Sequence, residues 1–126
     1  GPTPPIGISV PQAMYDDFVE ICKPVKNINP DFPFEVKVAK PRKRPTSTGG
    51  TDASVFAVEG VPTYGFTTDD IKGYNFSYGE IWHTERDLYT KNIPEYQEHT
   101  AVVTAIVALG VANLDKQLSR EGMYKE

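Results

Sequence analysis

The chain has 126 residues, of which 39% are hydrophobic and 24% are charged, a balance typical of one globular domain rather than of a disordered chain. Its formal net charge of −4 excludes the strongly basic character of nucleic-acid-binding proteins. The absence of an apolar run of about 18 residues excludes a membrane-spanning helix, and the single cysteine, Cys22, excludes an intrachain disulfide.

The first part of the chain predicts an extended segment followed by a helix. Residues 1–8 predict an extended lead-in, Ser9 suits a helix cap and Pro11 suits a first helical turn. Pro24 predicts that the helix ends near Lys23, because proline removes a helical hydrogen bond. One helical face carries apolar side chains, among which the cysteine is expected to be a small core residue: Met14, Phe18, Ile21, Cys22 and Val25.

The middle of the chain predicts two strands and a short helix. After a turn at residues 29–31, apolar and charged side chains alternate over residues 34–38, which predicts a half-buried strand. Thr51 or Asp52 is expected to cap a short helix that ends before a glycine at position 60. Residues 61–66 predict a second, buried strand.

The last part predicts an aromatic loop and a long helix. Residues 67–80 form the predicted loop, and the helix is expected to begin at Asn92 and Pro94. Because residues 101–114 are almost entirely apolar, we expect this helix to be well buried against a sheet. The order of elements predicts an α/β layer architecture. Two predicted strands are too few for a sheet that is stable by itself, so we expect the chain to be one part of a larger domain. One stripe carries the apolar side chains: Val103, Ile106, Val107, Gly110, Val111, Leu114 and Leu118.

Two histidines are candidates for chemistry. His83 follows Trp82, which can wall a pocket, and it precedes Thr84 and Asp87, which can hold the loop by hydrogen bonds. A metal-ligating histidine needs such support. His99 has polar neighbours near the start of the last helix and is expected to be exposed.

Three further segments have ordinary structural interpretations beside functional ones. The two glycines of residues 49–56 allow the backbone to approach a ligand, or they form a tight turn before a helix cap. Asp69 and Asp70 are expected to be solvated loop acids rather than a cation site. The cations of residues 40–44 are expected to belong to a solvated loop rather than to a binding patch.

Four of these segments together resemble a known family. The chain is similar, over about residues 34–118, to the C-terminal part of the family 28 zinc metallopeptidases, and most like their bacterial aminopeptidase-like members. The motifs occur in the family's order: Gly50-Thr51-Asp52-Ala53-Ser54-Val55-Phe56, Gly60-Val61-Pro62, Trp82-His83-Thr84-Glu85-Arg86-Asp87, and the long apolar helix from Pro94.

The resemblance implies a fold, a reaction and a site. The fold is α/β, a partial three-layer zinc-exopeptidase fold, with residues 1–126 as the C-terminal strands and helices of a mixed central sheet. The reaction is hydrolysis of peptide bonds by metal-activated water, with two zinc ions in the parent enzyme. His83 is implied as a metal ligand and Asp52 as an orienting carboxylate. The implied substrate pocket contains Tyr64, Tyr74, Tyr78 and Trp82.

The resemblance also implies missing parts. The family's other ligands lie upstream in a His-x-Asp, a Glu-Glu pair and a further Asp, and this sequence contains neither a His-x-Asp nor a Glu-Glu. Ala53 stands where the family often has histidine, which leaves the hydrogen bonding of Asp52 open. We therefore expect an inactive fragment without tightly bound zinc.

The expected partners are a peptide substrate of the parent enzyme, the missing N-terminal half, and a second copy paired through open sheet edges. Relatives are often exported, which implies a periplasmic or extracellular location. Two alternatives stay open: a portion of a glutaminyl-cyclase-like acyltransferase, which would use a single zinc ion, and a non-catalytic binding module on the same scaffold.

Overall fold

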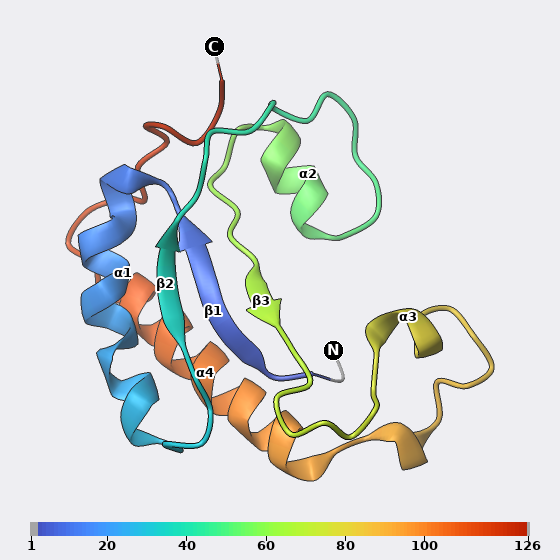
Figure 1. Cartoon of the computed structure of the whole chain (residues 1–126). Helices are drawn as coiled ribbons and strands as arrows, with labels where there is room; N and C mark the ends of the chain where they lie inside the picture. Colours follow the sequence, from blue (N-terminus) through green and yellow to red (C-terminus); the bar gives the residue numbers. More distant parts are fainter. Residues whose placement is uncertain (1–2, 126) are drawn as a thin grey trace.

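The computed structural model describes residues 3–125, which form a small mixed α/β domain (Figure 1). Three strands and four α-helices follow one another, with short 3₁₀ helices between some of them. The strands are β1 (Pro5–Val10), β2 (Glu35–Val38) and β3 (Phe66–Thr68). The helices are α1 (Tyr15–Cys22), α2 (Ala53–Val58), α3 (Tyr78–Ile81) and α4 (Pro94–Ala112), and the 3₁₀ helices are Gln12–Met14, Lys23–Asn27 and Tyr89–Lys91.

The sheet is mixed, with β1 in its centre. Strand β2 pairs parallel to β1 and β3 pairs antiparallel to it. Ile8 lies opposite both Val36 and Phe66, so the apolar side chains of the three strands share one face. Gly7 suits the parallel pair because a Cβ there would lie 2.5 Å from the carbonyl oxygen of Glu35.

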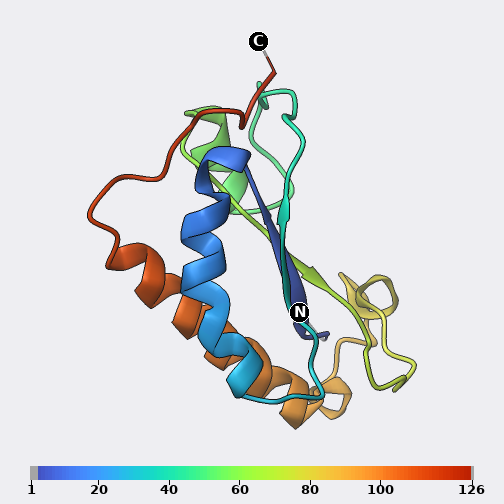
Figure 2. The same cartoon turned by 60° about the vertical axis from the view of Figure 1, so that its left-hand side comes forward.

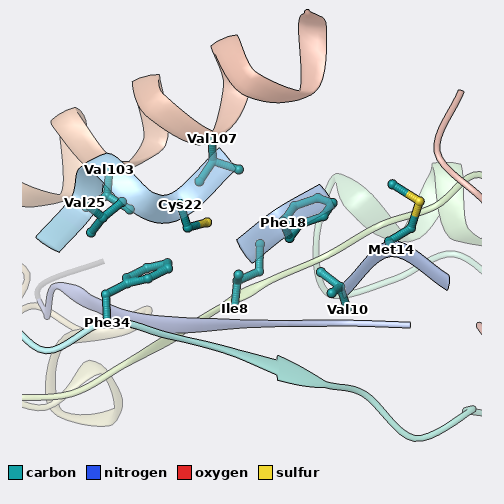
Figure 3. Packing of buried hydrophobic residues seen from close by; sticks show 9 residues of the cluster. All are labelled: Ile8, Val10, Met14, Phe18, Cys22, Val25, Phe34, Val103 and Val107. Atoms are coloured by element: carbon teal, nitrogen blue, oxygen red, sulfur yellow. The ribbon is translucent and has the colours of Figure 1, made fainter. Parts of the chain in front are cut away.

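Helices α1 and α4 cover the apolar face of this sheet, as the two views show (Figures 1 and 2). On the opposite face, Glu35, Lys37 and Thr67 are exposed, and no helix of residues 3–125 packs along them. The described residues thus form two layers. The α/β class and the mixed sheet were predicted correctly, while the third layer of the zinc-exopeptidase fold is not formed by this part of the chain. Figure 3 shows the core side chains: Ile8, Val10, Met14, Phe18, Cys22, Val25, Phe34, Val103 and Val107.

Two strand predictions were wrong. Residues 1–8 were expected to be a lead-in, whereas Pro5–Val10 is the central strand. Proline is tolerated as the first residue of a strand, so Pro5 marks the beginning of β1. The second predicted strand, residues 61–66, lies before the actual one, because β3 pairs with β1 only from Phe66 onward.

The helices agree more closely with their periodicity. Helix α1 ends at Cys22, and the chain continues as a 3₁₀ helix in which Pro24 occupies the first turn. Burial of Cys22 raises the pKa of its thiol to about 11, in agreement with a core role. Helix α2 covers residues within the predicted span, and Gly60 follows it at φ +74°.

Helix α4 begins at Pro94 as predicted, but it is buried on one side only. Val103 and Val107 are buried, whereas Leu109 is 64% exposed. The expectation of a well-buried helix was therefore wrong for its outer side, since α1 and the sheet cover a single stripe. Within residues 3–125, no helix combines the length and the apolar character required to cross a membrane.

Candidate functional site

His83 lies in a hydrogen-bonded turn that follows α3. The side-chain hydroxyl of Thr84 donates to the carbonyl oxygens of Glu80 (3.1 Å) and Ile81 (3.0 Å) and accepts the backbone N–H of Arg86 (3.2 Å). The backbone N–H of Asp87 donates to the carbonyl of Thr84 (3.2 Å). His83 itself has φ +55°, a left-handed conformation that persists where surrounding contacts fix it. The predicted supporting role of Thr84 is confirmed.

The imidazole of His83 is the end of an aromatic stack. Its ring lies 4.3 Å from that of Trp82, at an interplanar angle of 28°, and Trp82 lies 6.1 Å from Tyr78 at 27°. Tyr78 and Trp82 are 55% and 51% exposed. All three rings line an open cavity of about 590 Å³ that also contacts Asp87 and Lys91. Of the four predicted pocket residues, Tyr78 and Trp82 thus lie beside His83.

The other two predicted pocket residues lie elsewhere. Tyr74 lines a neighbouring depression together with Phe76 and Glu95. Tyr64 packs edge-to-face on Phe18, with ring centroids 5.4 Å apart, and lines a different cavity. The structure therefore separates the predicted pocket into two parts, of which only one adjoins His83.

Asp52 does not meet His83. It occupies the position before α2, it is exposed, and its side chain makes no capping hydrogen bond. The turn is instead closed by Ser54, whose hydroxyl accepts the Gly49 N–H (2.9 Å) and donates to the carbonyl of Thr51 (2.7 Å). Asp52 is absent from the described residues that line the cavity beside His83. Figure 1 shows α2 and α3 near opposite ends of β3.

The described residues do not by themselves fit a zinc ion. Residues 3–125 contain no group of three or more His, Cys, Asp or Glu side chains that could hold a metal. Catalytic zinc takes about three protein ligands, so His83 supplies one donor at most. Any zinc site built on this residue needs ligands from outside the described structure.

His99 is buried, contrary to the prediction that it is exposed. The side chain is 3% exposed and stacks on Phe32 with ring centroids 4.3 Å apart. Neither ring nitrogen has a hydrogen-bond partner among the described residues, and burial lowers the pKa of the imidazole. The polar neighbours were misleading, because His99 shares the buried stripe of α4 with Tyr96 and Val103. Their spacing at i, i+3 and i+7 was the signal that could have revealed it.

Asp70 forms a network that was missed. Its carboxylate accepts hydrogen bonds from the Tyr96 hydroxyl (2.7 Å) and from the backbone N–H groups of Tyr74 (3.1 Å) and Phe76 (3.2 Å). The hydrogen bond from Tyr96 is the main cause that lowers the pKa of Asp70. The expectation of a solvated loop acid was therefore wrong for Asp70, which holds the loop that leads to the aromatic stack.

A second set of contacts reinforces this network. Lys72 forms an ion pair with Glu95 (2.7 Å), which also accepts the hydroxyl of Tyr74. The backbone N–H of Lys72 donates to the Tyr96 hydroxyl oxygen (2.8 Å). Burial, and then the hydrogen bond to Asp70, raise the pKa of Tyr96 to about 12, so this hydroxyl remains a neutral donor.

Comparisons of the chain with protein-family models, curated proteins and solved structures found no match.

Proposed function

We propose that this chain is the C-terminal portion of a zinc-dependent exopeptidase of the aminopeptidase type, in which His83 is one zinc ligand. The observation that carries the proposal is the setting of this histidine in its motif. His83 is exposed and lines an open cavity, on a turn that Thr84 holds by hydrogen bonds. An accessible imidazole on an ordered turn is suited to complete a metal site whose other ligands come from a second segment.

The finer fold assignment belongs to the same proposal. The described sheet has three strands, and β2 and β3 each pair with β1 alone. We propose that the strands form the C-terminal part of a larger mixed sheet. An upstream half of the parent enzyme would extend that sheet and cover its polar face. Unpaired strand edges and an uncovered sheet face support this arrangement, because both favour further packing.

The substrate assignment is a peptide bound with an apolar side chain against Tyr78 and Trp82. Both rings are about half exposed and line the cavity beside His83. Aromatic faces bury apolar side chains favourably. Asp52 and Tyr64, which the resemblance also implicates, lie away from this cavity and are not part of the proposed subsite.

The test is a zinc titration of the 126-residue chain, followed by NMR, beside His83→Ala. Four-ligand structural zinc sites reach about 10–16 kcal/mol. One imidazole therefore provides on the order of a quarter of this free energy, which corresponds to a Kd of about 1–15 mM. We expect weak binding whose chemical-shift changes centre on residues 82–87 and disappear in His83→Ala. The exposed Glu98→Gln is the matched control and retains binding. Binding that is unchanged in His83→Ala would overturn the assignment.

The second candidate is a non-catalytic binding module, favoured by the lack of a three-ligand group in residues 3–125. The two proposals differ in a peptidase assay of the chain mixed with metal and with an upstream half of a related enzyme. Restored hydrolysis of an aminoacyl substrate that depends on His83 supports the exopeptidase. Formation of a folded complex without hydrolysis supports the binding module.

A further inference from the structure

A second cavity lies at the end of the sheet opposite to α3. It encloses about 200 Å³ where the parallel strands β1 and β2 end, and its walls include Ser9, Lys40 and Tyr64. Figure 1 shows that the C-terminal segment and α2 also lie at this end of the molecule, whereas α3 lies near the other end of β3. The cavity shares no lining residue with the cavity beside His83.

The side chains around this cavity are rich in donors. Two cations, Lys40 and Arg42, and two residues with aliphatic hydroxyl groups, Ser9 and Thr63, belong to its lining. No carboxylate of the described residues lines it, although the chain as a whole has a net charge of −4. Because donors and positive charge outnumber charged acceptors, the cavity is complementary to an anion.

Arg42 is held in place at the wall. Its Nη2 donates to the hydroxyl oxygen of Thr63 (2.8 Å), and its guanidinium carbon lies 5.8 Å from the centre of the Tyr124 ring. Arginine has five N–H donors on three nitrogens, and both hydrogen bonds to Thr63 come from Nη2 alone. A fixed guanidinium with further donors available is a favourable partner for a multidentate oxyanion.

The C-terminal segment closes one side of the cavity. The backbone N–H of Arg42 donates to the carbonyl of Met123 (3.1 Å), and the N–H of Lys125 donates back to the carbonyl of Arg42 (2.9 Å). The Tyr124 hydroxyl donates to the carbonyl of Ala57 (3.2 Å). The cavity is therefore a built feature in which three distant segments of the chain are joined by hydrogen bonds.

We propose that this cavity binds a phosphate group, as inorganic phosphate or as a small phosphate monoester, through Lys40 and Arg42. Two cations and several hydroxyl donors match a dianion with three or four acceptor oxygens better than a monovalent carboxylate. The site is independent of the proposed zinc ligand, and its test requires no metal.

The experiment titrates the whole chain with inorganic phosphate at constant ionic strength, followed by NMR. We expect saturable binding, with shift changes at residues 9–11, 39–42 and 63–65. Lys40→Gln should weaken binding by about tenfold, the factor that corresponds to the loss of one good hydrogen bond. The control is Lys43→Gln, which removes a neighbouring exposed cation outside the cavity and leaves the affinity within about twofold.

Titrations with other anions identify the ligand. Equal affinity for acetate would overturn the phosphate assignment. Tighter binding of O-phosphoserine than of inorganic phosphate identifies a monoester as the ligand, and the reverse identifies the free ion. The absence of saturation, or equal weakening in Lys43→Gln and Lys40→Gln, would reduce the effect to diffuse charge attraction and overturn the proposal. Lys40→Gln leaves in place the backbone hydrogen bonds of Arg42 to the C-terminal segment.

Discussion

The hydroxyl of Tyr96 lies 2.7 Å from the carboxylate of Asp70 and connects the first turns of α4 to the loop that leads to the aromatic stack. The same hydroxyl accepts the backbone N–H of Lys72 at 2.8 Å. Tyr96 thus serves as donor and acceptor at once, and its side chain is 1% exposed. This arrangement links the position of residues 70–76 to the packing of a core helix.

Replacement of Tyr96 by phenylalanine should lower the free energy of unfolding by about 1–2 kcal/mol, because it removes one donor and one acceptor from a network with a charged member. Urea denaturation measures the change. The matched control is Asp69→Asn, which preserves the Oδ1 atom that accepts the N–H of Asp70, and its stability should change by less than about 0.5 kcal/mol. Equal effects of the two substitutions would contradict a specific role of Tyr96.

Much of the fold was predictable where a local periodicity exists. The buried face of α1, the alternation in β2 and the start of α4 at Pro94 follow from spacing and from proline chemistry. Strand β1 was missed because its status depends on partners far away in the sequence. Ile8 pairs with Val36 and Phe66, and no local pattern indicates which extended segment becomes the centre of a sheet.

The candidate site was predictable in its local parts only. The turn around His83 and its aromatic neighbours follow one another in sequence, so the pattern Trp82-His83-Thr84 located them. Asp52 was assigned by resemblance, and its distance from the cavity beside His83 depends on how two loops are arranged in space. The bond between Asp70 and Tyr96 joins residues with no shared local pattern, and only the fold reveals it.

Burial of His99 should make the protein sensitive to acid. The folded-state pKa of this imidazole is lowered by burial, whereas an unfolded histidine has a pKa of about 6.5. As the pH falls below about 6.5, the unfolded state binds a proton that the folded state excludes, so stability declines until the lower folded pKa is reached. The maximal slope is about 1.4 kcal/mol per pH unit. Lys72, on the ring of Phe32 at 5.3 Å, adds positive charge beside the stack.

The measurement is urea denaturation at pH 7.5 and at pH 5.5 for the native chain and for His99→Phe. The substituted ring can still stack on Phe32 but does not titrate, so the loss of stability between the two pH values should shrink. His83→Gln, which removes the exposed histidine, should retain the native loss. If His99→Phe kept the full loss, carboxylates such as Asp70 would be its source.

Strand β2 should mediate self-association through its outer edge. The N–H of Ala39 donates to Val10 in β1 (2.7 Å), and successive N–H groups of a strand point to opposite sides, so the N–H of Val38 points outward. Proline is tolerated on an edge strand when its position faces solvent. Val38→Pro should therefore abolish the dimer in sedimentation velocity, while Val38→Thr retains it. A native chain that remains monomeric at millimolar concentration would contradict this prediction.

The contact between α1 and α4 depends on the absence of a side chain at Gly110. A Cβ there would lie 2.5 Å from Cγ2 and 3.1 Å from Cβ of Ile21, atoms near the backbone that cannot rotate away as a long side chain can. Alanine gains about 1 kcal/mol in helix propensity over glycine, whereas overpacking a core costs about 1–3 kcal/mol. Gly110→Ala should thus be neutral to destabilising by about 2 kcal/mol, although a solvent-exposed position would show a gain.

A double-mutant cycle distinguishes steric crowding from other causes. Ile21→Ala alone should be destabilising because Ile21 packs against the core, by about 2 kcal/mol or more for a partly buried isoleucine. In the Ile21→Ala background the crowding atoms are gone, so Gly110→Ala should become stabilising by about 1 kcal/mol through helix propensity alone. The coupling energy between the two positions is then favourable and measurable by urea denaturation. Additive effects would mean that the helices separate at this point and that the close approach of α1 and α4 does not determine the packing of the domain.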